Sequence, residues 1–258
     1  KPPEEDGQKA NSGNATPPVA TAPATPGSNT AGSINIRETL DNRGQIIAGG
    51  AVSLTTGESL HNDGEMQLSH LLAEGENMDG SGNIDATRAT IRTKHTEIGG
   101  RFSGQSLDLD TGTFTNCSIL RFDHINWSKL QELSNYGDID SKASLNWNMR
   151  HLNNGSGGKL RTAGSFDFKG ETIENHGTLL SHGAQNITAE NFYNNGLLAT
   201  GDSQTLRAQK LEQGSNGEID AARIDWKAPR INNGGAVFIT GNSTLHVEAP
   251  VINNRGII

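Results

Sequence analysis

The sequence predicts an all-β protein: a right-handed parallel β-helix of about twelve coils, preceded by a disordered linker. Three observations lead to this prediction. A turn motif recurs every 19 to 20 residues, apolar and polar residues alternate between the turns, and glycine is abundant while aromatic residues are scarce. Glycine accounts for 32 of the 258 residues, whereas aromatic residues make up 5%. This composition favours an elongated fold of short strands and many turns.

Residues 1–33 differ in composition from the rest of the chain. They hold six of the eight prolines and, apart from Val19, no large apolar side chain. Such a segment buries too little apolar surface to offset the entropy that it would lose on ordering. We therefore expect a disordered linker at 1–33 and a repeat domain at 34–258, which we interpret as an internal fragment of a longer shaft.

The repeat is a turn motif, Φ-x-N-x-G-x-Φ, in which Φ is an apolar residue. Twelve units follow one another at intervals of 16 to 21 residues, with a mean near 19. A unit of this length cannot bury its apolar side alone, so stacking on its neighbours must form the core. The first positions are Leu40, Leu60, Met78, Ile98, Phe114, Leu133, Leu152, Ile173, Phe192, Leu211, Ile231 and Ile252.

The third position of the motif is asparagine in nine units, with Gln213, Gly80 and Gly100 in the others. In register, these amides are expected to form a hydrogen-bonded ladder along one corner of the rod. The fifth position is glycine in eight units. Because asparagine and glycine adopt positive φ at low cost, we expect a left-handed turn in each unit. The asparagines are Asn42, Asn62, Asn116, Asn135, Asn154, Asn175, Asn194, Asn233 and Asn254.

Between the turns, apolar residues recur with a period of two. Leu145 and Trp147 flank Asn146, and Phe166 and Phe168 follow in the next unit. This alternation is typical of a strand with one buried face. Coils stacked at the strand spacing of about 4.8 Å would build a rod of about 55 Å. Parallel crossovers are generally right-handed, which predicts the winding.

Three segments depart from the rule. Two units, Leu152–Leu160 and Leu211–Ile219, share a two-residue expansion that predicts small bulged loops. The segment from Gly75 to Gly104 is the least regular, with both turns that have glycine at the third position and the shortest interval. We expect a distorted coil or a surface loop there, and it is a candidate recognition feature.

Two pairs of side chains are candidates for ligand binding. Trp127 and Trp147 lie 20 residues apart and could stack against a sugar ring. Their phase favours the other interpretation, in which they belong to the inward apolar column together with Trp226. His176 and His182 are six residues apart, a spacing that would allow a metal site, but solvent-facing histidines are the favoured interpretation.

No motif of catalysis or cofactor binding is present, and we predict no catalytic, cofactor-binding or metal-ligating residues. There is no HExxH motif, no carboxylate cluster at metal spacing and no phosphate-binding loop in its strand-to-helix context. The net charge of -8 argues against nucleic acid as a partner. No run of 18 apolar residues predicts a transmembrane segment. The single cysteine, Cys117, excludes an internal disulfide.

Two stretches of sequence resemble the haemagglutinin repeats of the filamentous haemagglutinin family. They are LDNRGQIIAGGAVSLTTGESLHNDGEM and IENHGTLLSHGAQNITAENFYNNGLLATGDSQTL. This family consists of large adhesins of Gram-negative bacteria exported by two-partner secretion, and contact-dependent growth inhibition toxins use similar stalks. The resemblance covers about Ile34–Ile258. It implies a right-handed β-helical shaft, export through an outer-membrane secretion partner, and a secreted or cell-surface location.

The resemblance favours a structural and adhesive shaft, a monomeric rod that attaches to a receptor or glycan on host or neighbouring cells. One alternative is the stalk of a contact-dependent growth inhibition toxin. Another is a β-helical enzyme that degrades polysaccharides, but the outward charges vary from coil to coil and favour no enzyme. The chain ends inside a motif unit, VINNRGII, without the polar cap of a solenoid end, so we expect more coils to follow.

Overall fold

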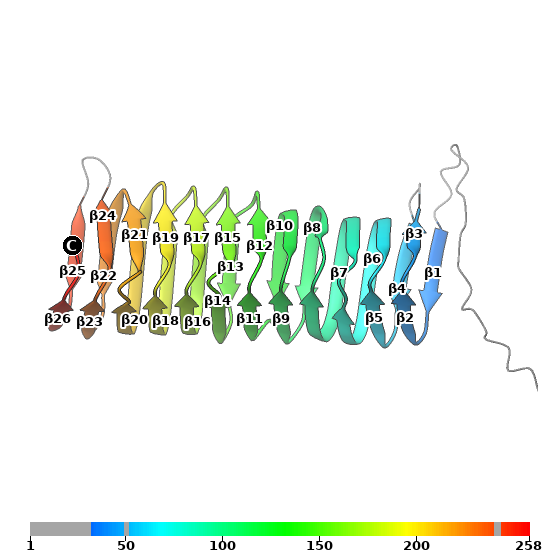
Figure 1. The fold of residues 1–258 in the computed structure, drawn as a ribbon, viewed down its shortest axis with the longest axis horizontal. Coiled ribbons are helices and arrows are strands. Elements are labelled where there is room, and N and C mark those ends of the chain that lie inside the picture. The colour runs from blue at the N-terminus through cyan, green and yellow to red at the C-terminus, as the bar shows by residue number, and fades with distance from the viewer. Residues whose placement is uncertain (1–31, 49–51, 240–243) are drawn as a thin grey trace, which may run out of the picture.

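The protein is a rod of stacked parallel coils, seen side-on in Figure 1. The computed structural model describes residues 32–48, 52–239 and 244–258. Within these ranges it holds 26 strands, all in one sheet, and no helix. The rod is an all-β parallel solenoid of about 11 turns with repeats of about 19 residues, which confirms the predicted architecture.

The predicted linker lies almost entirely outside the described residues. The first strand, β1, begins at Gly32, so it takes in the last two residues that the composition assigned to the linker. Its partner is β4, with Ile34 opposite Leu54. The coils therefore start slightly earlier than predicted.

Each coil has three sides, and each side forms one parallel face of the rod. On the first face, strands pair in register from one coil to the next, as Trp147 does with Phe168 and Phe168 with Ile187. The strands that contribute to this face are β1 (Gly32–Ile36), β4 (Val52–Thr56), β6 (Glu65–Asp79), β7 (Asn83–Ile98), β8 (Phe102–Asp110), β10 (Ile119–Ser128), β13 (Leu145–Asn148), β16 (Phe166–Asn175), β18 (Gln185–Asn194), β20 (Ser203–Gln213), β22 (Arg223–Lys227) and β25 (Leu245–Glu248).

The second face precedes the N-x-G turn. Leu133 pairs with Leu152 and Leu152 with Ile173, so the first positions of the motif stack directly. Besides the last residues of β6, β7, β16, β18 and β20, this face contains β2 (Thr39–Asn42), β5 (Ser59–Asn62), β9 (Thr113–Asn116), β11 (Glu132–Asn135), β14 (His151–Asn154), β23 (Arg230–Asn233) and β26 (Val251–Asn254).

The third face follows the N-x-G turn and closes the coil. Leu160 pairs with Leu179 and Leu179 with Leu198. Besides the first residues of β6, β7, β8 and β10, this face contains β3 (Gln45–Ile47), β12 (Asp138–Ser141), β15 (Lys159–Thr162), β17 (Thr178–Ser181), β19 (Leu197–Thr200), β21 (Glu218–Ala221) and β24 (Ala236–Ile239).

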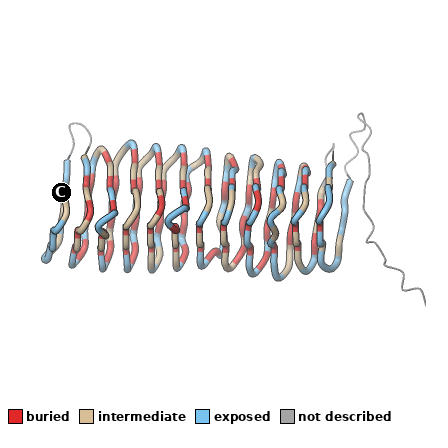
Figure 2. The backbone as a smooth tube through the Cα atoms, in the orientation of Figure 1, coloured by how far each residue is buried: buried red, intermediate tan, exposed pale blue. Residues whose placement is uncertain are grey.

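The core runs along the inside of the rod. Figure 2 shows buried residues alternating with exposed or intermediate ones along the strands between the end coils, which are themselves exposed. Strand β17, for example, buries Leu179 and Ser181 and leaves Thr178 and Leu180 partly exposed. The period-two pattern of the sequence is therefore the inside and outside of each strand.

The segment from Gly75 to Gly104 is regular, so the expected surface loop or distorted coil is wrong. Strands β6 and β7 run through two corners of the coil without a break. The phase predicted for this unit is also wrong: Thr96, and not Ile98, stacks under Phe114. Ile98 instead pairs with Asn116, and these coils have 18 residues. The motif was matched two residues late because Gly100 belongs to the glycine column.

The glycines of the N-x-G turns are required by close approach and not by positive φ. Among the described residues, positive φ occurs only at Gly75, Gly80 and Lys129, so the predicted left-handed turns are wrong. A Cβ atom at Gly196 would lie 2.1 Å from the carbonyl oxygen of Gly177, one coil earlier. A side chain at Gly196 would therefore push the two coils apart, although Ser118 occupies the same column one coil before Gly137.

Candidate functional surface

The asparagine ladder is the main polar feature of the interior. In the five consecutive asparagines from Asn116 to Asn194, each Nδ2 donates to the Oδ1 of the next at 2.8 Å. The Nδ2 of Asn154 also donates to the carbonyl oxygen of Thr178 at 3.1 Å. Each of these five asparagines is 0% exposed. These five asparagines are thus structural, as predicted, because the ladder engages their buried amides.

The ladder has two breaks. Its positions are occupied by Gly80, directly after β6, and by Ile98 at the end of β7, so no amide connects Asn62 to Asn116. At the other break, Gln213 donates to the carbonyl oxygens of Gly217 and Ala236 at 3.0 and 2.7 Å. Its own Oε1 has no hydrogen-bond partner. Glutamine is one methylene too long to fit the asparagine register.

A second buried polar column closes the corner between the third and first faces, and sequence reasoning missed it. It consists of Ser141, Thr162, Ser181 and Thr200, all at most 7% exposed. The hydroxyls of Ser181 and Thr200 both donate to the carbonyl oxygen of Gly183, at 2.6 Å each. Ser141, Ser181 and Thr200 each lie six positions after a ladder asparagine. This fixed spacing could have revealed the column from the sequence.

The two expanded units form turns that protrude at the ladder corner, as predicted. The structure adds that each expansion begins with a glycine under a tyrosine from the preceding coil. A Cβ at Gly155 would lie 2.6 Å from the ring of Tyr136, and one at Gly214 would lie 2.9 Å from the hydroxyl of Tyr193. The chain has only these two tyrosines. The tyrosines therefore pack on the expanded turns from outside.

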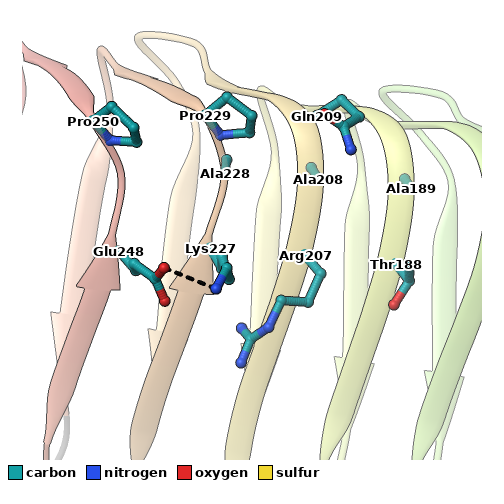
Figure 3. Close-up of a pocket in the computed structure, with 10 residues that line it drawn as sticks. All are labelled: Thr188, Ala189, Arg207, Ala208, Gln209, Lys227, Ala228, Pro229, Glu248 and Pro250. Atoms are coloured by element: carbon teal, nitrogen blue, oxygen red, sulfur yellow. Dashed lines mark ion pairs between the residues drawn. The ribbon is translucent and has the colours of Figure 1, made fainter.

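A shallow groove follows the corner between the first and second faces near the C-terminal coils (Figure 3). Its volume is about 450 Å³, and alanines from successive coils line it together with charged side chains. The charges are already engaged: Lys227 pairs with Glu248 at 2.8 Å, and Arg207 pairs with Asp225. The lining residues are Thr188, Ala189, Arg207, Ala208, Gln209, Lys227, Ala228, Pro229, Glu248 and Pro250.

A second depression, of about 360 Å³, lies on the second face beside Tyr193. Its lining combines that ring with Thr172, Asn191, Lys210 and Glu212. The lysine and Glu212 pair at 3.1 Å. An aromatic ring surrounded by hydroxyl, amide and charged groups is a combination that can hold a polar ligand with an apolar side.

His61 bridges two carboxylates on the outside of the second face. Its Nε2 lies 2.9 Å from Asp63, and its Nδ1 contacts Asp79 one coil later. These hydrogen bonds, first that to Asp79 and then that to Asp63, raise the pKa of His61. The pKa of Asp63 is lowered to about 2, mainly by the backbone N–H of Ser81 and then by His61.

The structure separates the predicted binding candidates or buries them. Trp127 and Trp147 touch edge to face with ring centroids 5.1 Å apart, and Trp147 is 2% exposed. Trp147 belongs to the core and Trp127 packs against it partly buried, so the two rings do not form an exposed platform for a sugar. His176 and His182 lie at opposite ends of β17, beyond reach of one metal ion. Across the described ranges, no group of three or more histidine, cysteine, aspartate or glutamate side chains could hold a metal.

Similarity to known proteins extends over most of the chain. The chain is 26% identical to "tRNA nuclease CdiA" of Yersinia mollaretii over 87% of the chain's length. This match covers 7% of the Yersinia protein. The chain is 31% identical to "Toxin CdiA" of Escherichia coli over 41% of its length, which is 3% of that protein. A "tRNA nuclease CdiA" of Escherichia coli strain NC101 is also 31% identical, over 40% of the chain and 3% of that protein.

The homologues of this chain are CdiA proteins. They are contact-dependent growth inhibition proteins similar to filamentous haemagglutinin, and the parallel solenoid is consistent with haemagglutinin repeats. The chain spans less than a tenth of the length of each of these CdiA relatives. No protein-family model and no solved structure matches it. Among the residues that the structure describes, no helix is long and apolar enough to cross a membrane.

Proposed function

We propose that the chain is a stalk segment of a secreted, cell-surface protein of the CdiA type, and that it performs no enzymatic step itself. One observation carries the proposal: the described residues form one solenoid sheet, and similarity to a CdiA protein covers 87% of the same chain. A solenoid of this kind sets a distance between whatever lies at its two ends. Export through an outer-membrane partner belongs to the same proposal.

The catalytic alternative gains no support from the outer faces. About half of the carboxylates in the described residues pair with lysine or arginine, as Asp123 does with Lys142 and Glu132 with Arg150, and no group of three or more histidine, cysteine, aspartate or glutamate side chains within these residues could hold a metal. The names that mention a tRNA nuclease belong to the relatives as whole proteins, of which this chain corresponds to a small part. We assign the chain the mechanical role and not the nuclease activity.

Removal of one coil tests the stalk. Deletion of residues 176–194 joins Asn175 to Asn195 and removes one 19-residue repeat in register. In a strain that exports the chain to its surface, we expect this deletion to leave display and contact-dependent inhibition largely intact. Deletion of residues 176–185 breaks the register and should abolish both. Equal loss from the two deletions would contradict a role in spacing.

Attachment to host or neighbouring cells is a second candidate function, favoured by the depression beside Tyr193. The labelled, purified chain would be titrated onto epithelial cells and onto bacteria. An adhesive segment binds saturably, and Tyr193→Ala weakens this binding, whereas the matched Tyr136→Ala does not, because Tyr136 does not line the depression. Binding that never saturates would leave spacing as the sole function.

A further inference from the structure

The third face carries an ordered arrangement of charge over four successive coils. Lys159 and Arg161 point outward from β15, and Glu218 and Asp220 point outward from β21. The two coils between them present four uncharged outward residues. These are Thr178 and Leu180 in β17, and Leu197 and Ala199 in β19.

These outward residues form two straight columns. In the first, Lys159 pairs with Thr178, Thr178 with Leu197, and Leu197 with Glu218. In the second, Arg161, Leu180, Ala199 and Asp220 follow in the same way. Each column thus reads positive, uncharged, uncharged, negative along the rod.

The two ends of this arrangement differ in their partners within the chain. Arg161 lies 3.2 Å from Asp138, and Lys159 is 3.8 Å from the same carboxylate. Neither Glu218 nor Asp220 makes an ion pair with any cation of the described residues. The acidic end therefore has an unused capacity for cations.

A column that reads positive, uncharged, uncharged, negative is complementary to its own reverse. Rotation by 180° about an axis parallel to the strands, between β17 and β19, reverses the direction of the rod and keeps each column opposite itself. Lys159 of one copy then faces Glu218 of the other, and Arg161 faces Asp220. At the centre, Leu180 faces the small Ala199, so a large side chain meets a small one.

We propose that this part of the third face pairs two copies of the chain side by side in opposite directions. Such a contact is isologous, the commonest arrangement in homodimers. Parallel, in-register pairing is disfavoured because it would set Lys159 of one copy against Arg161 of the other. The proposal replaces the monomeric rod that the sequence led us to expect, and it does not rest on the stalk function.

The pairing is expected to be weak. A face four residues wide and four coils long offers about 13 by 19 Å, or about 250 Å² per copy. Specific interfaces bury at least about 1,000 Å² in total, so the contact must continue over adjoining coils and falls in the transient class. Association should appear in the upper micromolar range and weaken with added salt, because its specificity is electrostatic.

A charge-swap experiment tests the proposal. Glu218→Lys with Asp220→Lys makes both ends basic, and Lys159→Glu with Arg161→Glu makes both ends acidic. Each variant alone should associate about tenfold more weakly than the native chain, or less, in sedimentation velocity. An equimolar mixture of the two should recover association, because every basic end then faces an acidic one.

Two further variants keep the outcome decisive. Leu180→Ser replaces the large side chain at the centre with a small one, leaves every ion pair in place and should also weaken self-association. Glu171→Lys with Glu190→Lys makes the same change of net charge as Glu218→Lys with Asp220→Lys, but at exposed positions on another corner. This control should leave self-association unchanged. A native chain that stays monomeric up to near-millimolar concentration would overturn the proposal. Association that survives the charge reversal, or a mixture that fails to recover it, would overturn it too.

Discussion

The coils formed by β6 and β7 and those formed by β14 to β19 enclose the same kind of apolar core but close their corners differently. In the first region the ladder position holds Gly80 and Ile98, and the strands pass the corner between the third and first faces without a break. In the second region, asparagines occupy the ladder, and β17 ends at Ser181 before β18 begins at Gln185.

The difference follows coil length. Where a coil has 18 residues, the corner after the third face is packed with Leu68 and Ala86, which are 4% and 0% exposed. Where a coil is longer, the corner contains extra backbone whose carbonyl oxygens need hydrogen-bond donors. Buried hydroxyls such as that of Ser181 supply these donors. A solenoid can therefore close its coils by packing or by buried hydrogen bonds, and the choice is made corner by corner.

The largest effect is expected at the ladder. Asn175→Leu removes an amide that donates to Asn194 and accepts from Asn154, so each neighbour loses one buried hydrogen bond, although Asn154 still donates to Thr178. The variant should lose about 3 kcal/mol of unfolding free energy. Ile98→Asn, which places an amide beside Asn116 in the region without a ladder, should cost less. Equal losses in denaturant titrations would mean that the ladder contributes nothing specific.

A substitution in the glycine column should cost nearly as much unfolding free energy as one in the ladder. Gly196→Ala places a Cβ atom 2.1 Å from the carbonyl oxygen of Gly177 and should cost about 2 kcal/mol or more. At Gly44 the same change meets nothing within 4 Å, so Gly44→Ala serves as the matched control and should be nearly neutral. If thermal unfolding responds alike to both, close approach does not explain why glycine recurs at this position of the turn.

The hydroxyl column should give a smaller change. Ser181→Ala removes a 2.6 Å hydrogen bond to the carbonyl oxygen of Gly183 and should cost about 1 kcal/mol. Ser134→Ala, at a partly exposed outward position of β11, is the control and should be within about 0.5 kcal/mol of the native chain. The idea fails if the two serines prove equivalent in chemical denaturation.

The smallest effect concerns His61. Its raised pKa means that its contribution is complete below about pH 6.5 and disappears as pH rises through the raised value. The pKa of Asp63 falls from 3.8 to about 2, so its contribution is present above about pH 4 and fades as pH drops towards 2. The contact between these coils should be tightest from about pH 4 to 6.5.

Amide hydrogen exchange at Ser81, corrected for the intrinsic pH dependence of exchange, can measure this contact. His61→Gln should flatten the rise in opening above pH 6.5, because glutamine does not titrate. A pH profile that is identical in the native and variant chains would show that His61 has no part in it.

The sequence was informative wherever one residue type is required at a fixed interval. Asparagine at the ladder satisfies two coils at once, so its spacing revealed both the coil and the column. The hydroxyl column was missed because serine and threonine are also common on outward positions, such as Ser134 and Thr178. The unit in β7 was misphased because, without an asparagine, Gly100 resembled a third position although it belongs to the fifth.

The candidate surface was harder to predict than the fold. The packing of Tyr136 and Tyr193 on the glycines of the expanded turns depends on which residues meet between coils. The pattern of charge on β15 to β21 is likewise visible only once the register is known. Sequence spacing placed His176 and His182 near each other, but a four-residue strand holds them apart.

The edge-to-face pair of Trp127 and Trp147 provides an intrinsic optical signal for contact between two coils. Two indoles at 5.1 Å couple electronically, so their near-ultraviolet circular dichroism depends on contact between the coils at mid-rod. The third tryptophan, Trp226, is buried nearer the C-terminal coils, where it donates to Gln204. If melting spreads from coil to coil, as nearest-neighbour stability implies, the two optical signals will be lost at different denaturant concentrations.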